Sequence, residues 1–89
     1  MDETTVLVRN PEVVEAEVDG QRVLMSPKDF SYFGLVDTGA LVWDRIDGQT
    51  TLGDLVSSLA AEFGEDPATV RADVTDFVSA LESSGLLAT

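Results

Sequence analysis

Carboxylates are the only abundant side chains in this sequence that could carry out acid–base or metal chemistry. The chain has 89 residues, of which 17 are Asp or Glu, and it contains no His and no Cys. Nucleophilic triads that need an imidazole or a thiolate are therefore excluded, as are metal sites built from these ligands. A disulfide framework is excluded for the same reason.

Carboxylates with helical or clustered spacing are the remaining candidates for catalysis or cation binding. Two acids three residues apart on a helix could do general acid–base work, and a tight cluster could bind calcium. The candidates are Asp44 with Asp47, Asp73 with Asp76, and the cluster of Glu62, Glu65 and Asp66. Such spacings arise by chance in an acidic chain, the cluster lacks the pattern of a calcium loop, and no glycine-rich phosphate loop is present. We therefore expect a binding protein and no enzyme, with no catalytic residue, no metal site and no cofactor.

The net charge of −12 limits the class of partner. Phosphate backbones and anionic membranes would be repelled, whereas a cationic peptide or a basic protein would be attracted. Solubility alone is the alternative reason for the acidity. No run approaches 18 apolar residues, and the N-terminus lacks the regions of a signal peptide, so we expect a cytoplasmic location.

Residues 13–35 have the alternating pattern of a small antiparallel sheet. Val13–Val18 alternates apolar residues with glutamates, Asp19-Gly20 suits a tight hairpin turn, and residues 22–25 form the returning strand. A turn around Pro27 leads into a third strand over Phe30–Leu35. Residues 1–12 are expected to be a loose arm or a short extra strand, ahead of one domain over residues 13–89.

From Asp37 onward the apolar period changes from two to 3.6, which predicts three helices. The first begins at Asp37 or Thr38 and ends at Gly48 as a left-handed cap; the second begins at Thr51 and ends at Gly64; the third begins at Asp66-Pro67 and ends at Gly85. The expected apolar faces are Gly39, Val42, Trp43 and Ile46 in the first helix; Leu52, Leu55, Val56, Leu59 and Phe63 in the second; and Val70, Val74, Phe77 and Leu81 in the third, with Val78 at its shoulder. The fold class is therefore α+β, a three-stranded antiparallel sheet followed by three helices.

The third strand carries apolar side chains on both of its faces. Phe33 and Leu35 are expected to join the core with Trp43, whereas Phe30 and Tyr32 point the other way and are candidates for ligand contact. The strand contains no proline, and only Lys28 and Asp29 beside it offer charges that would protect an open edge. An extended peptide could therefore add to this edge. On the third helix, Val78 and Arg71 are the candidates for the side of the resulting groove.

The block from Val13 to Leu87 resembles the PqqD-like family of peptide-recognition domains, also called RiPP recognition elements. The features that carry the resemblance are Asp19-Gly20, Tyr32, Leu35, Thr38-Gly39-Ala40, Trp43, Asp47-Gly48, Thr51, Leu55, Leu59, Asp73-Val74, Phe77, Leu81 and Gly85-Leu86. They follow the family's order and spacing over about five-sixths of the chain. One departure is Val36, where the family often has an asparagine that caps the turn, so that Asp37 or Thr38 would have to do so here.

This resemblance implies a winged helix-turn-helix-like domain that captures the leader segment of a ribosomally made precursor peptide. The leader would add as a strand to the third strand and lie in the cleft beside the third helix. A separate maturation enzyme, such as a leader peptidase, a cyclase or a radical SAM enzyme, would then act on the precursor. The implied leader-binding residues are Phe30, Ser31, Tyr32, Phe33, Gly34, Leu35, Arg71, Asp73, Val74, Phe77, Val78 and Leu81. The compact form and the Ala/Val/Asp/Gly usage favour a lasso-peptide pathway.

Two other functions fit parts of the pattern. A winged-helix DNA-binding regulator has the same architecture, but its recognition helix would offer Arg71 against several acids, which repels phosphate. An acidic interaction module could instead use the open strand edge to dimerise, and we expect a monomer or a weak homodimer.

Overall fold

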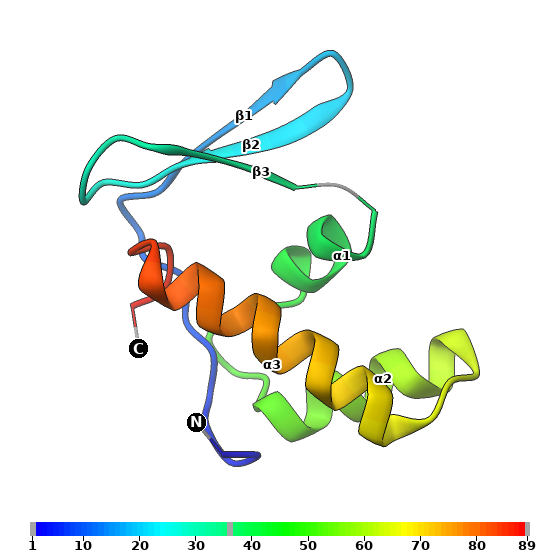
Figure 1. Cartoon of the computed structure of the whole chain (residues 1–89). Coiled ribbons are helices and arrows are strands. Elements are labelled where there is room, and N and C mark those ends of the chain that lie inside the picture. The colour runs from blue at the N-terminus through cyan, green and yellow to red at the C-terminus, as the bar shows by residue number, and fades with distance from the viewer. Residues whose placement is uncertain (1, 36, 89) are drawn as a thin grey trace.

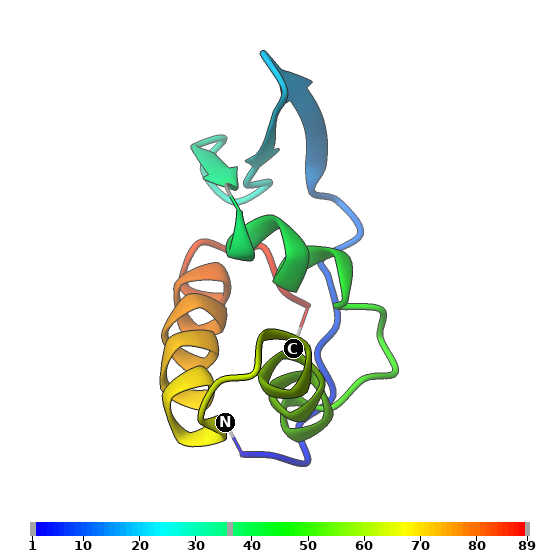
Figure 2. The same cartoon turned by 90° about the vertical axis from the view of Figure 1, so that its right-hand side faces the viewer.

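The computed structural model describes residues 2–35 and 37–88. Its elements in chain order are β1 (Val14–Val18), β2 (Gln21–Met25), β3 (Tyr32–Leu35), α1 (Thr38–Asp44), α2 (Leu52–Phe63) and α3 (Pro67–Ser83) (Figure 1). The three strands form one antiparallel sheet with the order β1-β2-β3. Figures 1 and 2 show this sheet at one end of the molecule, with all three helices on the same side of it. The expected α+β, winged helix-turn-helix-like fold is confirmed. No helix in the described part of the chain is long and apolar enough to cross a membrane.

The sheet follows the expected hairpin pattern. Strand β1 (Val14–Val18) pairs with β2 (Gln21–Met25) through a two-residue turn, in which Asp19 has φ 53° and Gly20 has φ 80°. Positive φ at both turn positions matches the twist of the flanking strands, which is why Asp-Gly is suited to this position.

Strand β3 is shorter than predicted. It spans Tyr32–Leu35, so the expected start at Phe30 is wrong. Phe30 lies in the preceding turn at φ 62°, and its N–H donates to the carbonyl of Ser26. A left-handed backbone conformation cannot continue a strand, and this turn therefore delays the start of β3 by two residues.

Helix α1 spans Thr38–Asp44 and has Arg45 as its C-cap, so the expected end at Gly48 is wrong. Gly48 does have a positive φ, but it serves the following loop, where its N–H donates to the carbonyl of Leu7. The carboxylate of Asp47 accepts hydrogen bonds from the N–H groups of Gln49 and Thr50, and these bonds lower the pKa of Asp47. The loop is therefore closed by its own hydrogen bonds three residues beyond the helix.

The start of α1 is confirmed, because the helix begins at Thr38 with Asp37 as its N-cap. Asp37 occupies the N-cap position at φ 46°, but its side chain makes no capping hydrogen bond. Of the two residues expected to take the place of a capping asparagine, Asp37 and Thr38, the first does not do so through its side chain. Val36, the position of that departure from the family, lies outside the described residues.

Helices α2 and α3 begin and end as their local signals predict. Helix α2 (Leu52–Phe63) begins with the Thr51 side chain accepting from the N–H of Asp54, and it ends at Gly64, which has φ 64°. Helix α3 (Pro67–Ser83) begins with the carboxylate of Asp66 accepting from the N–H of Ala68. These caps satisfy backbone donors locally, which is why they can be recognised without knowledge of the tertiary structure.

The core lies between the three helices and the face of the sheet that they cover. Its fully buried side chains are Leu7, Leu24, Leu35, Val42, Trp43, Ile46, Leu52, Leu55, Leu59, Val78, Leu81 and Leu86. The predicted position of Val78 at the shoulder of the apolar stripe is wrong, because its exposed fraction is 0%. Phe63 is the opposite case: it was expected in the core stripe of α2, but it is 44% exposed at the end of that helix.

The N-terminal residues do not form a loose arm, because they pack into the core. Leu7 is 1% exposed, and its backbone exchanges hydrogen bonds with Thr50 and Gly48. Isolated bridges pair Val6 with Thr51 and Arg9 with Leu87. The segment therefore runs between the start of α2 and the C-terminus and connects both to the sheet.

Arg9 and Trp43 form a polar connection between this segment, α1 and β1. The Arg9 guanidinium lies 4.7 Å from the Trp43 ring centroid and donates to the carbonyl of Trp43 at 2.6 Å. The indole N–H of Trp43 donates to Glu15 at 2.7 Å, and Glu15 also lies 3.7 Å from the Arg9 guanidinium. The buried tryptophan thus has a partner for its single donor, as a buried indole requires.

Candidate functional site

Strand β3 has one open edge. It pairs with β2 in the register Leu24 with Phe33, and no strand pairs with its other side in residues 2–35 and 37–88. The N–H of Ser26 donates to the carbonyl of Ser31, which identifies Ser31, Phe33 and Leu35 as the residues whose backbone groups face β2. The backbone N–H and C=O groups of Tyr32 and Gly34 therefore point to the open edge.

The turn that precedes this edge is held by a carboxylate. Asp29 accepts hydrogen bonds from the hydroxyl and the N–H of Ser31, and these bonds lower the pKa of Asp29. The buried Ser26 hydroxyl donates to the carbonyl of Ser84 at 2.5 Å, at the end of α3. The start of β3 is therefore fixed relative to α3.

The inner face of β3 also contacts α3 through two aromatic rings. The ring centroids of Phe33 and Phe77 are 6.2 Å apart with an interplanar angle of 67°, an edge-to-face arrangement. Gly39 of α1 lies directly against the Phe77 ring, and a Cβ at that position would be 3.3 Å from it. The glycine therefore allows α1 to approach α3 next to the strand.

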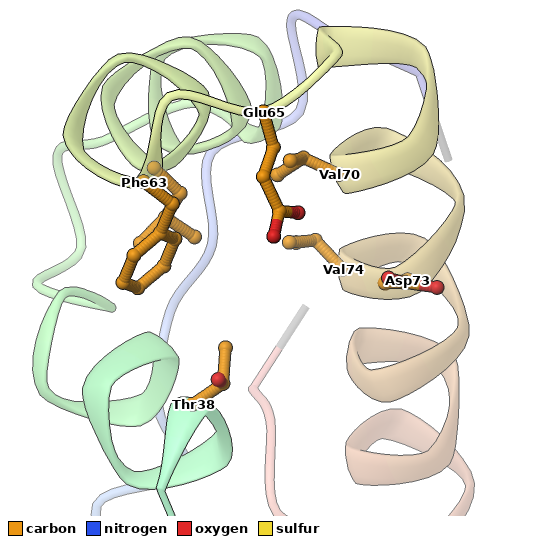
Figure 3. A pocket seen from close by; sticks show the side chains of 7 residues that line it. Thr38, Phe63, Glu65, Val70, Asp73 and Val74 are labelled. Carbon is orange, nitrogen blue, oxygen red and sulfur yellow. The ribbon is translucent and has the colours of Figure 1, made fainter.

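A groove with two adjoining hollows, each of about 250 Å³, lies between α1 and α3. Both hollows are lined by Thr38, Asp73 and Val74. One extends along α1 and is completed by Gly39, Val42 and Phe77; the other extends toward the end of α2 and is completed by Leu59, Phe63, Glu65 and Val70. In Figure 3, Phe63 and Glu65 project from the end of α2 and the segment after it, opposite Val70 and Val74 of α3. Phe77, which completes one of the hollows, also contacts Phe33 of β3.

The groove is electrostatically negative. Each of the four arginines is engaged in an intramolecular ion pair: Arg9 with Glu15, Arg22 with Asp44, Arg45 with Glu62, and Arg71 with Glu3. Within the described residues, Glu65 and Asp73 have no such partner, and both are exposed. A ligand segment in the groove therefore meets apolar walls and uncompensated carboxylates.

The structure brings together most, but not all, of the residues expected at the site. Ser31, Tyr32 and Gly34 are exposed at the strand, and Phe30 is exposed in the turn before it. Tyr32 is 75% exposed and Phe30 is 69% exposed, which leaves both rings free to contact a ligand. Asp73, Val74 and Phe77 line the groove between α1 and α3. No residue of β3 lines either hollow, so the cleft between the third strand and the third helix stays a prediction.

Four predicted site residues are placed elsewhere. Val78 and Leu81 have an exposed fraction of 0%, and Leu35 has 2%, so all three lie in the core. Arg71 lies on α3 but pairs with Glu3 of the N-terminal segment, and it does not line the groove. The wheel of an isolated helix cannot show which flank of an apolar stripe another element covers, and this is why Val78 was expected at the edge of the stripe although it is buried. Leader contact by Arg71 stays a prediction.

Several groove residues were not predicted as site residues. Thr38 and Gly39 belong to a motif that the sequence does show, and the absence of a side chain at position 39 is the signal that could have identified them. Phe63 and Glu65 gave no such signal, because Phe63 continues the apolar stripe of α2 and Glu65 is one of many acids.

The chain is similar to one known protein family and to several solved structures. The sequence pattern of the family described as coenzyme PQQ synthesis protein D (PqqD) matches residues 21–87. No curated protein sequence matches the chain. Among solved structures, TbiB1 in complex with the TbiA(beta) leader peptide is 31% identical, with a TM-score of 0.78 over 91% of this chain and 94% of that chain.

Two further solved structures share the fold at lower identity. Lasso peptide synthetase B1 complexed with the leader peptide is 24% identical, with a TM-score of 0.80 over 96% of this chain and 100% of that chain. The PqqD truncation of Methylobacterium extorquens PqqCD, described as a stand-alone RiPP recognition element, is 22% identical, with a TM-score of 0.78 over 99% of this chain and 94% of that chain.

Proposed function

This chain belongs to the PqqD family, and from that premise we propose that it binds the leader segment of a ribosomally synthesised precursor peptide. The leader adds as a further strand to the open edge of β3 and continues into the groove between α1 and α3. The domain makes no chemical change to the precursor. It presents the precursor to a separate maturation enzyme, such as a leader peptidase, a cyclase or a radical SAM enzyme.

The open edge of β3 beside the groove is the observation that carries this proposal. Tyr32 and Gly34 direct two N–H and two C=O groups away from β2, which is the pattern that an added strand requires. Backbone hydrogen bonds at such an edge supply affinity, and pockets for alternate side chains supply specificity. The likeness to TbiB1, which was solved in complex with a leader peptide, supports leader binding.

Side-chain contacts divide into two groups in this proposal. The exposed rings of Phe30 and Tyr32 contact the leader at the strand, because large aromatic side chains give much contact area at low entropic cost. Asp73 and Phe77 contact the leader in the groove, together with Thr38. The unpaired carboxylates favour a leader that is neutral or basic where it crosses the groove. A lasso-peptide pathway stays a prediction, which the identity of the bound leader will test.

Fluorescence polarisation with labelled leader peptides tests the proposal. The leaders to be tested come from precursor peptides whose genes lie near the gene of this protein. Each leader is titrated with the purified protein, and we expect one of them to bind with sub-micromolar to micromolar affinity. Tyr32→Ala should weaken binding without lowering stability, because this side chain is 75% exposed. If none of the leaders binds, the proposal is wrong.

A pair of proline variants tests strand addition at this edge. In Gly34→Pro, the lost N–H points to the open edge of β3, so the pairing with β2 is retained while one hydrogen bond to the leader is lost and its approach is blocked. Because one such bond contributes about 1 kcal/mol and the ring adds a clash, we expect affinity to fall by about tenfold or more. Glu17→Pro, whose lost N–H points outward from β1, is the matched control. Equal leader affinities for the two folded variants would refute binding at β3.

A further inference from the structure

The face of the sheet that points away from the helices carries no charged side chain. The register places the following residues on the face opposite to the buried Leu24 and its cross-strand partners. We call them the outer face: Val14, Ala16 and Val18 of β1, Val23 and Met25 of β2, and Tyr32 of β3. Its two other positions, Gln21 and Gly34, are also uncharged. Figures 1 and 2 show that no helix covers this side of the sheet.

The amphipathic pattern of β1 is inverted relative to a sheet that simply covers a core. Its glutamates are on the side of the helices, where Glu15 accepts from the Trp43 indole. On the same side, Arg22 of β2 pairs with Asp44 of α1. The valines of β1 face outward, and Val14 is 51% exposed and Val18 55% exposed.

An uncharged, largely apolar sheet face is unusual on a chain with a quarter of its residues charged. A sheet with one free face normally alternates so that its polar side chains face water. Contiguous exposed apolar surface marks an interaction site more often than it marks a solvated surface. The outer face therefore has the properties of an interface for another protein.

Charge decides which kind of protein fits there. The turns and ends that border the sheet contain the exposed acids Glu12, Asp19, Asp29 and Asp37, against one exposed base, Lys28. If a second copy of this chain docked there, the acids of one copy would face those of the other, and two net charges of −12 would repel each other. A complementary partner has an apolar centre with a basic rim.

The outer face is also continuous with the edge at which the leader is proposed to add. Tyr32 belongs to both, because its side chain is on the outer face and its backbone groups point to the open edge. In a strand added to β3, every second side chain would extend the outer face. A protein docked there would contact the chain and its leader together.

We propose that the outer face is the docking surface for the maturation enzyme, which presents an apolar patch with a basic rim and contacts the added leader strand at the same time. This inference rests on the proposed leader binding. Because the leader forms part of the contact surface, leader and enzyme each raise the affinity of the chain for the other by the same factor.

The double variant Val14→Thr/Val18→Thr tests the docking surface. Threonine keeps the β-branched shape and replaces one methyl group with a hydroxyl on each exposed side chain, so the fold should be retained. Ala61→Ser/Ala72→Ser makes changes of similar size at exposed positions of α2 and α3 and is the control. Both proteins are compared with the unmodified chain by circular dichroism and by leader titration, in which all three should agree.

Each maturation enzyme encoded beside the chain is purified separately, and its binding to the immobilised protein is measured with and without the leader. We expect one enzyme to bind, to bind more tightly when the leader is present, and to bind at least fivefold more weakly to Val14→Thr/Val18→Thr. Unchanged affinity of the double variant for the enzyme would overturn the inference, as would a lack of binding by every enzyme.

Sedimentation of the unmodified chain tests whether a second copy of the chain occupies the outer face instead. A dimer that Val14→Thr/Val18→Thr dissociates would assign the outer face to a second copy and overturn the inference. The leader titration contains no enzyme, so a failure of leader binding is distinguished from a failure of enzyme docking.

Discussion

Leu7→Ala tests whether the N-terminal segment belongs to the cooperative core of this domain. The family pattern begins only at residue 21, yet Leu7 is 1% exposed and is among the largest fully buried side chains. Its backbone also exchanges hydrogen bonds with Thr50 and Gly48 in the loop before α2. Truncation to alanine would therefore leave a cavity in the core.

The expected magnitude follows from burial. Leucine-to-alanine changes at fully buried sites lower the free energy of unfolding by about 2–5 kcal/mol, through lost apolar transfer and the remaining cavity. A domain of this size has a total stability of about 5–15 kcal/mol, so the loss is a large fraction of it. At about 4–8 °C per kcal/mol, the melting temperature should fall by roughly 10 °C or more.

Urea unfolding followed by the fluorescence of Trp43 is a suitable assay, because this residue is the only tryptophan and is buried. Glu12→Ala is the control, since it truncates an exposed side chain in the same segment and should change stability by no more than about 0.5 kcal/mol. A loss of less than 1 kcal/mol for Leu7→Ala, with an unchanged dependence on urea, would show that residues 1–12 are dispensable for the core.

Three further predictions concern the interior and the turns. Val78→Ala should lower the free energy of unfolding by about 2 kcal/mol because the side chain is fully buried, and urea unfolding measures this; unchanged stability would place Val78 at the surface. Gly85→Ala should cost about 1–2 kcal/mol in the same assay, because φ is 76° and the new Cβ would lie 3.2 Å from the Lys28 Cβ; a neutral effect would contradict this conformation. The pKa of Asp47 is lowered from 3.8 by hydrogen bonds from the N–H groups of Gln49 and Thr50, so this carboxylate stabilises the fold above that pH and the stabilisation is lost as the pH falls through its folded pKa. Thermal melts of Asp47→Ala should therefore show a deficit that is constant from pH 7 to pH 5 and that disappears in strong acid; a deficit independent of pH would refute the role of the charge.

Elements with complete local signals could be predicted from the sequence. The Asp19-Gly20 turn, the cap at Thr51 and the start of α3 at Asp66 each satisfy or orient their own backbone within a few residues. The exposed ring of Tyr32 also followed from the alternation along β3, because the opposite face was already filled by apolar residues. Those predictions needed no knowledge of neighbouring elements.

The predictions that were wrong concern residues whose environment depends on contacts with distant parts of the chain. Gly48 has the backbone conformation of a helix cap, but Leu7, 41 residues earlier in the chain, takes its hydrogen bond in a loop beyond the helix. Val78 was expected at the edge of the apolar stripe but is buried, and Phe63 was expected in the core but is exposed. Both differences arise because burial on a helix depends on which neighbouring element covers each flank. No local pattern contains that information.

By itself, the sequence determined the order and type of the elements, the absence of imidazole and thiolate chemistry, and the negative charge, because these depend on residue types and short-range spacing. The tertiary structure decided that the N-terminal segment is part of the core and that the groove lies between Thr38 and Asp73. It also decided that the valines of β1 face away from the helices. These features depend on contacts between residues distant in the chain, and the same alternation of valine and glutamate is compatible with either face of β1 turned inward.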